Sequence, residues 1–399
     1  MSTKKSVWQE CILKDIITIK KGKKPKNLYS EYKFGLMPYI DIKCFEKNII
    51  DNYGDSDKMV IYDSNENHIL LVWDGARSGL VGKFKGVGIV CSTIALIITS
   101  INKNFLEYYL NSKYTFLNKN TKGTGIPHIN PDKLLNLKIL IPPLEEQKLI
   151  SEKIKSEFQK IDNALNKLNT IKEQIKQYKQ SVLKYAFDEN NSFAKGSNYK
   201  PYEWEEKILK DISESIQYGY TASASKVKNG IKFLRITDIQ DGKVNWYNVP
   251  YCNISNNNKN KYLLKDGDLV FARTGATVGK SYLINNLEEE SIFASYLIRI
   301  RFDNMTNFYY MKYYFQSNYY WEQINNNKVG IGQPNVNGTK LSKVKIKLPN
   351  IELQKTIADN IQNIFDKSDN IENIINENID KLSVLKKSVL KKAFEGKLI

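Results

Sequence analysis

The chain has 399 residues, of which 41% are hydrophobic and 12% aromatic, which excludes a wholly disordered protein and is enough for two or three folded domains. Sixty Lys and Arg residues stand against 43 Asp and Glu residues, so the net charge is +17. This excess predicts a polyanionic partner, either nucleic acid or an acidic membrane surface.

The sequence lacks the signals of several other protein classes. The segment after Lys4 and Lys5 turns polar at once, which is unlike a signal peptide. The longest apolar run, residues 89–98, is too short to span a bilayer. The four cysteines form no CxxC pair, and two histidines do not suggest a zinc site. We therefore expect a cytoplasmic protein with reduced thiols, no metal, no cofactor and no membrane partner.

The first globular part, residues 1–141, is expected to contain short β-strands separated by Gly and Asn turns. It carries a dense basic cluster that is either a solvated loop or a set of DNA phosphate contacts. A Gly-flanked turn further on contains Arg77 and Lys83, and an arginine there either reads guanine with two hydrogen bonds or is a plain surface residue. The lysines of the cluster are Lys20, Lys21, Lys23 and Lys24.

A long helix is predicted next, within residues 142–190. Pro142 and Pro143, followed by acidic residues, are typical of a helix start. Apolar residues then recur every seven positions, which is the pattern of a coiled coil. They are Ile154, Ile161, Leu168, Ile175 and Val182.

The second globular part, residues 191–348, resembles the first in its predicted strands and turns. Its candidate DNA contacts are Arg235, Arg273, Thr274 and Lys280, and Arg273 is aligned with Arg77 of the first part. An aromatic-rich stretch, residues 309–321, is either core or a platform for flipped bases.

A second long helix is predicted within residues 349–399, and its heptad residues are Ile361, Ile375, Leu382 and Val389. Each helix has room for about 44 residues, or roughly 65 Å. An apolar stripe of this length needs a partner, and the two helices are expected to pair antiparallel.

The whole chain is an internal duplication. Residues 8–16 recur as 204–212, and residues 181–187 recur as 388–394. The offset grows inside the globular copy only. Either the helices set a distance between parts that vary in what they contact, or loops simply tolerate insertions.

The positive charge follows this duplication. Residues 1–144 and 191–348 each carry a net charge of +8, whereas 145–190 carries +1 and 349–399 carries zero. Two basic parts joined by neutral helices favour duplex DNA over a membrane as the partner.

No catalytic motif is convincing. Pro131-Asp132 followed by Glu146-Gln147-Lys148 imitates a metal-dependent nuclease, but the second copy lacks both carboxylates. No phosphate-binding loop and no methyltransferase motif is found.

The order of these elements resembles the DNA specificity subunit of type I restriction–modification systems. The resemblance covers the whole chain and includes helix starts at 142–148 (PPLEEQK) and 349–355 (PNIELQK), with Asn350 and Leu353 departing from the usual pattern. Each helix ends on Ser-Val-Leu-Lys-x-Ala-Phe.

The resemblance implies an α+β fold in which two target recognition domains, 1–141 and 191–348, are joined by two spacer helices, 142–190 and 349–399. It implies a non-catalytic protein that binds double-stranded DNA at a bipartite target, two methyltransferase subunits, and restriction subunits. If the half-site centres lie roughly 10 base pairs apart, a gap of about six pairs results. The alternative is a stand-alone coiled-coil DNA-binding or scaffold protein without methyltransferase partners.

Overall fold

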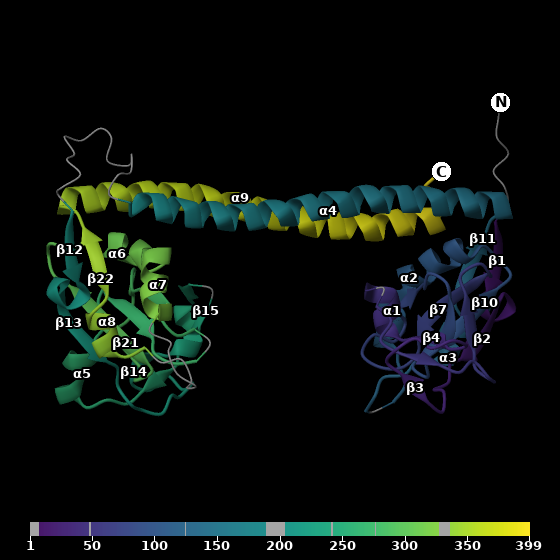
Figure 1. Cartoon of the computed structure of the whole chain (residues 1–399), viewed down its shortest axis with the longest axis horizontal. Helices are drawn as coiled ribbons and strands as arrows, with labels where there is room; N and C mark the ends of the chain where they lie inside the picture. The colour runs from purple at the N-terminus through teal and green to yellow at the C-terminus, as the bar shows by residue number, and fades with distance from the viewer. Residues whose placement is uncertain are drawn as a thin grey trace. The chain divides into compact units, whose positions relative to one another are not determined.

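The computed structural model describes residues 8–47, 49–123, 125–188, 204–240, 242–275, 277–326 and 336–399. The chain forms two compact units. Unit 1 comprises Met1–Leu168 with Asn376–Ile399, and unit 2 comprises Asn169–Ile375. Each unit holds one globular part and a segment of both long helices, which continue from one unit into the other (Figure 1).

The globular part of unit 1 contains three sheets, in the orders β1-β11, β2-β10-β7-β8 and β3-β5-β4-β9-β6. The strands are β1 (Gln9–Ile12), β2 (Ile17–Lys21), β3 (Leu28–Tyr29), β4 (Met37–Ile40), β5 (Tyr53–Gly54), β6 (Ile61–Asp63), β7 (His68–Val72), β8 (Val81–Gly82), β9 (Val87–Val90), β10 (Ile94–Thr99) and β11 (Lys138–Ile141). Three helices accompany them: α1 (Ile42–Lys47), α2 (Lys103–Lys119) and α3 (Pro131–Leu135).

The globular part of unit 2 contains sheets in the orders β12-β22, β13-β21-β18-β19, β17-β14-β20 and β15-β16. The strands are β12 (Glu205–Ile208), β13 (Ser213–Tyr218), β14 (Ile231–Leu234), β15 (Ile239–Gln240), β16 (Lys243–Val244), β17 (Tyr251–Cys252), β18 (Leu269–Ala272), β19 (Ser281–Leu283), β20 (Ser291–Phe293), β21 (Leu297–Phe302) and β22 (Lys345–Leu348). The helices are α5 (Asn256–Tyr262), α6 (Phe308–Tyr314), α7 (Asn318–Asn326) and α8 (Gly338–Ser342).

The two globular parts share one topology. The β1-β11 ladder pairs Gln9 with Ile141, and the β12-β22 ladder pairs Glu205 with Leu348, which are the same positions of the repeat. In both ladders the chain enters and leaves the globular part on adjacent antiparallel strands. The internal duplication predicted from the sequence is therefore present in the strand pairing.

Two long helices, α4 (Leu144–Ala186) and α9 (Ile351–Phe394), account for the predicted spacers. Within unit 1, Lys386 of α9 lies over the ring of Phe158 of α4, with Nζ 5.0 Å from the ring centre. Within unit 2, Lys179 of α4 lies over Phe365 of α9 at 5.7 Å, the same contact with the helices exchanged.

The heptad residues lie where the pattern predicts them. Leu168 and Leu382 are half-buried. The others are buried: Ile154, Ile161, Ile175, Val182, Ile361, Ile375 and Val389. Because burial of an apolar stripe supplies most of the stability of a long helix, these contacts hold the helical segments of each unit together.

A buried glutamine fixes each globular part to its helix. Gln147, in the first turn of α4, accepts the N–H of Asn102 at 2.9 Å and donates to Pro142 O at 2.8 Å. Gln354, in the first turn of α9, accepts the N–H of Asn307 at 2.8 Å and donates to the Pro349 carbonyl. Each amide satisfies buried backbone groups at both ends of the junction.

The aromatic-rich stretch of unit 2 belongs to the core and does not form a platform for bases. Five of its rings are fully or almost fully buried, and these are Tyr310, Tyr313, Tyr314, Phe315 and Tyr320. Among the described residues, no helix is long and apolar enough to cross a membrane.

Candidate nucleic-acid interface

The basic cluster of unit 1 lies on both sides of Gly22, whose backbone packs closely against the end of β9. Lys20 and Lys21 end β2, and Lys23 and Lys24 follow Gly22; all four lysines are exposed. A Cβ on Gly22 would lie about 2.1 Å from a backbone carbonyl oxygen at the end of β9, so only glycine fits. The close crossing fixes the backbone from which these lysines project.

Lys21 is tied into a small polar cluster. Its Nζ donates to the carboxylate of Asp74 at 2.9 Å, and His128 Nδ1 lies 2.6 Å from the same carboxylate. Burial would raise the pKa of Asp74, but the hydrogen bonds from Lys21 and His128 outweigh it and hold that pKa below its usual value. Lys21 is thus an anchored cation, whereas Lys23 and Lys24 form no ion pair with the described residues.

Unit 2 has the same close backbone approach at the equivalent glycine, but the neighbouring side chains differ. Gly219 crosses β20 as Gly22 crosses β9, since a Cβ there would lie about 2.2 Å from Ala294 O. Tyr218 stands where Lys21 stands in unit 1. Its hydroxyl accepts the N–H of Gly338 at 2.8 Å, and the guanidinium of Arg273 lies 5.0 Å from its ring centre.

Backbone hydrogen bonds align the turns of the two units. The N–H of Gly79 donates to Val72 O at 2.9 Å, and the N–H of Gly279 donates to Ala272 O at 2.9 Å. Both turns also contain a glycine with positive φ three residues after this acceptor, 104° at Gly75 and 82° at Gly275.

This alignment corrects the sequence prediction that Arg77 and Arg273 are matched. Arg273 follows Ala272 and is the counterpart of Trp73, which follows Val72. Thr277 is the counterpart of Arg77. The sequence alignment was displaced by four residues because it matched arginine to arginine and not the Gly-Ala pairs 75–76 and 275–276.

The two arginines differ in their surroundings. Arg77 is exposed in its turn. Arg273 is half-buried, and its Nε has no hydrogen-bond partner among the described residues. Because this Nε is itself buried, a contact of Arg273 with DNA would have to be made by the terminal nitrogens of the guanidinium. Thr274, the counterpart of Asp74, is half-buried beside it.

The other predicted contacts lie in different settings. Arg235 donates to both carboxylate oxygens of Asp238, at 3.1 and 2.8 Å. Lys83 forms an ion pair with Glu107 and lines a cavity with residues of α2 and α4. Lys280 is exposed and lines a second cavity, described below. Arg235 and Lys83 are thus engaged outside the turn clusters, whereas Lys280 ends the turn that contains Arg273, since its carbonyl accepts the N–H of Ala272 at 2.9 Å.

Sequence reasoning missed Asp74, His128 and Tyr218. Asp74 and His128 are brought together only by tertiary structure, so no local signal marks them. Tyr218 had a signal, since it immediately precedes Gly219 as Lys21 precedes Gly22.

The carboxylates that imitated a nuclease motif have structural contacts. Asp132 is exposed and pairs with Lys122 at 3.0 Å, and Glu146 accepts the indole N–H of Trp8 at 3.0 Å. Among the described residues, no group of three or more His, Cys, Asp or Glu side chains is placed to hold a metal ion.

Two repeats of one mixed helix-and-sheet fold, each with a basic or arginine-bearing loop cluster, are typical of a DNA-binding protein built by duplication. Residues 5–177 and 201–381 both match the family described as the type I restriction modification DNA specificity domain. The chain belongs to this family of DNA specificity subunits.

Several relatives share this assignment. The type I restriction enzyme MjaVIII specificity subunit of Methanocaldococcus jannaschii is 30% identical over 98% of this chain and 93% of its own length. The EcoKI specificity subunit of Escherichia coli K12 is 27% identical over 69% of this chain and 61% of its own length.

Solved structures share the fold. A chain from a study of complex assembly and conformational transition of the type I R-M system superposes with a TM-score of 0.78 at 17% identity, covering 98% of both chains. The HsdS subunit of Thermoanaerobacter tengcongensis superposes with a TM-score of 0.57 at 18% identity, covering 98% of this chain and 97% of the other.

Proposed function

We propose that this chain reads a bipartite DNA target, with each globular part contacting one half-site across a non-specific gap. The observation that carries the proposal is the repeated loop cluster. One backbone presents Lys21 and Asp74 in unit 1 but Tyr218, Thr274 and Arg273 in unit 2. Side chains of different chemistry on one scaffold favour two different half-site sequences.

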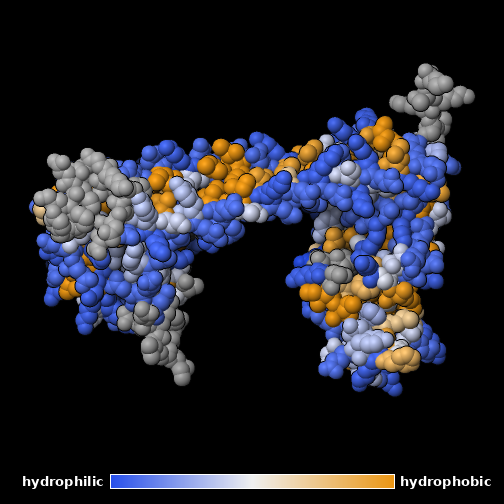
Figure 2. Space-filling model, turned by 45° about the horizontal axis from the view of Figure 1, so that its top comes forward, coloured by the Kyte–Doolittle hydropathy of each residue, from blue (hydrophilic) through white to orange (hydrophobic). Residues whose placement is uncertain are grey.

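In this proposal the chain is non-catalytic and recruits enzymes. It docks two methyltransferase subunits, and restriction subunits join the complex. The long helices support such docking, because each carries large apolar side chains that remain exposed, and Figure 2 shows apolar surface along them. These residues are Ile171, Tyr178 and Tyr185 of α4 and Ile371, Ile374, Val384 and Leu385 of α9.

Methylation mapping by long-read sequencing of cells that carry this subunit and its methyltransferase tests the proposal. We expect one asymmetric target with two specified segments and a gap of about six base pairs. A contiguous target contradicts the two-part reading.

Co-purification separates the proposal from a stand-alone scaffold. We expect two methyltransferase subunits per chain, and no methylation or cleavage of DNA by the purified chain alone with methyl donor or Mg²⁺. A chain that binds DNA but no methyltransferase subunit is a scaffold or regulator of another kind.

A further inference from the structure

Each unit contains a cavity where the globular part meets the helices. In unit 1 it measures about 370 Å³ and is lined by Lys83, Glu107 and Tyr108 together with α4 residues. In unit 2 it measures about 740 Å³ and is lined by Lys312 and Tyr313 together with residues of both helices. We call these cavities elbow 1 and elbow 2.

The two elbows occupy the same place in the repeat. Tyr108 packs edge-on against Phe158 of α4 at 5.7 Å, and Tyr313 packs edge-on against Phe365 of α9 at 5.3 Å. Lys312 precedes Tyr313 as Glu107 precedes Tyr108. The charge of this position is therefore reversed between the two units.

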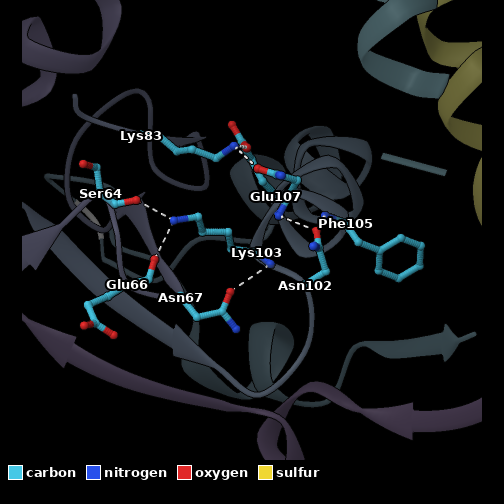
Figure 3. A network of polar contacts seen from close by, with 9 residues as sticks. Ser64, Glu66, Asn67, Lys83, Asn102, Lys103, Phe105 and Glu107 are labelled. Carbon is cyan, nitrogen blue, oxygen red and sulfur yellow. Dashed lines mark hydrogen bonds and ion pairs between the residues drawn. The ribbon is translucent and has the colours of Figure 1, made fainter. Parts of the chain in front are cut away.

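In elbow 1, the carboxylate of Glu107 is paired with a lysine of the same unit. Lys83 forms an ion pair with Glu107 and donates to Asn104 Oδ1 at 2.6 Å (Figure 3). Burial raises the pKa of Glu107, and the nearby Lys83 ammonium opposes that shift. The pair lies beside the start of α2, where Asn102 caps the helix and Lys103 donates to two backbone carbonyls.

In elbow 2, Lys312 is the counterpart of Glu107 and forms no ion pair with a described residue. The polar contact of Lys312 Nζ is Gln362 Oε1 at 3.4 Å, and no carboxylate of the described residues lies within 4 Å of this ammonium. The nearest acidic groups are already engaged, since Asp366 accepts from Gln362 and Asp369 pairs with Lys179. Burial lowers the pKa of Lys312.

Three more lysines line the same cavity, and one of them, Lys179, is paired with Asp369 and Glu372. Lys243 and Lys280 are exposed at its lining, and Trp321 and Phe315 supply apolar surface. A partly buried cation without a counter-charge is unfavourable until an anion reaches it. The mixed lining suits a carboxylate carried on a side chain.

We propose that elbow 2 receives an Asp or Glu side chain of a methyltransferase subunit, whereas Glu107 supplies the equivalent carboxylate internally in elbow 1. The inference rests on the proposed function. It is supported by the positive charge of the cavity, which complements a carboxylate. It is also supported by position, because the helical segments that carry exposed Tyr178, Ile371 and Ile374 line elbow 2 as well. A side chain fits a cavity of about 740 Å³, whereas a DNA duplex, whose major groove alone is about 12 Å wide, is too large to enter it.

The test is titration of the full-length chain with the purified methyltransferase subunit, following each binding step by native mass spectrometry and calorimetry. Lys312→Gln is expected to weaken one of the two steps about 30-fold or more and to leave the other unchanged. Lys312→Arg keeps the charge and is expected to bind within about threefold of wild type. Lys265→Gln, an exposed lysine of unit 2, is the matched control and is expected to change neither step.

Folding is checked by the melting temperature, which Lys312→Gln is expected not to lower, because the variant removes a partly buried charge. A wild-type chain that binds no methyltransferase subunit refutes the proposed function itself. A wild-type chain that binds two, with Lys312→Gln binding both equally well, refutes this inference alone.

Other occupants have distinct outcomes. Phosphate or ATP binding to the isolated wild-type chain that Lys312→Gln abolishes, with methyltransferase binding intact, makes elbow 2 a small-anion site and overturns the proposal. A loss of DNA affinity in Lys312→Gln without any methyltransferase present also overturns it.

Discussion

Single residues decide how the two repeats differ. Trp8 and Trp204 are equivalent, but Glu146, which accepts the Trp8 indole N–H, is replaced by Leu353 in the second copy. The Trp204 indole N–H is buried and has no hydrogen-bond partner among the described residues. The departure from the usual helix start that the sequence showed at Leu353 thus has a local cost in unit 2.

A matched pair of substitutions measures that difference. Trp8→Phe removes a hydrogen-bonded indole N–H and leaves Glu146 without this donor. Trp204→Phe removes a buried indole N–H that has no hydrogen-bond partner among the described residues. We expect Trp8→Phe to destabilise its unit by about 1 kcal/mol more than Trp204→Phe destabilises its own. Differential scanning calorimetry of the intact chain checks the prediction, and equal losses would contradict it.

Arg273 is the residue we expect to contribute most to the second half-site. Arg273→Ala is expected to weaken binding of the methyltransferase complex to cognate DNA by about 1–3 kcal/mol while random DNA is affected less. Fluorescence anisotropy with both duplexes measures this. An equal loss on both duplexes would make Arg273 a phosphate contact or a structural residue.

The basic loop of unit 1 is expected to behave in the opposite way. Charge reversal at Lys23 and Lys24 removes exposed cations, so affinity should fall on every sequence. The slope of log K against log[salt] should become shallower by about 0.9 for each lost phosphate contact. Lys21 is a poorer choice for this test because its reversal would also disturb Asp74 and His128.

At the scale of elements, the junction between globular part and helix is the most tightly specified feature. Gln147→Ala is expected to cost about 1–3 kcal/mol, because the N–H of Asn102 and the carbonyl of Pro142 lose their partner in a buried site. Hydrogen exchange at the Asn102 amide reports the loosening directly. Gln159→Ala, on the exposed face of the same helix, is the control and should change stability by less than about 0.5 kcal/mol.

Whether an element could be predicted depends on how far apart in the sequence its interacting residues are. The long helices and their buried stripe follow from a seven-residue period, which is local in sequence. The strand pairing of β1 with β11, or the contact of Asp74 with His128, depends on segments more than 50 residues apart and left no local pattern. The alignment of Arg77 with Arg273 failed because side-chain identity was followed where the glycine backbone positions were the better guide.

At the scale of the whole molecule, the continuity of α4 and α9 through both units gives a prediction about the DNA gap. Deleting one heptad from each helix shortens it by about 10 Å, or about three base pairs of B-DNA. We expect the methylation map of such a variant to show a shorter gap and unchanged half-sites. Altered half-sites with the original gap would show that the helices do not set the spacing.

The elbows show what the duplicated plan leaves free to change. Helix contacts repeat nearly residue for residue, as at Phe158 with Lys386 and Phe365 with Lys179, whereas the cavity charge is reversed between Glu107 and Lys312. The sequence revealed the repeat but not this reversal, because nothing local marks a residue as facing a cavity.

The two-stranded ladders β1-β11 and β12-β22 have a genetic consequence. The polypeptide between the two strands of each ladder leaves and rejoins the rest of the chain at that ladder, and the two ladders have the same register. Recombination within the gene at those two positions would exchange the whole globular part while preserving the pairing of the two strands. New DNA specificities would then arise by swapping gene segments between strains in a single event, without a succession of point mutations.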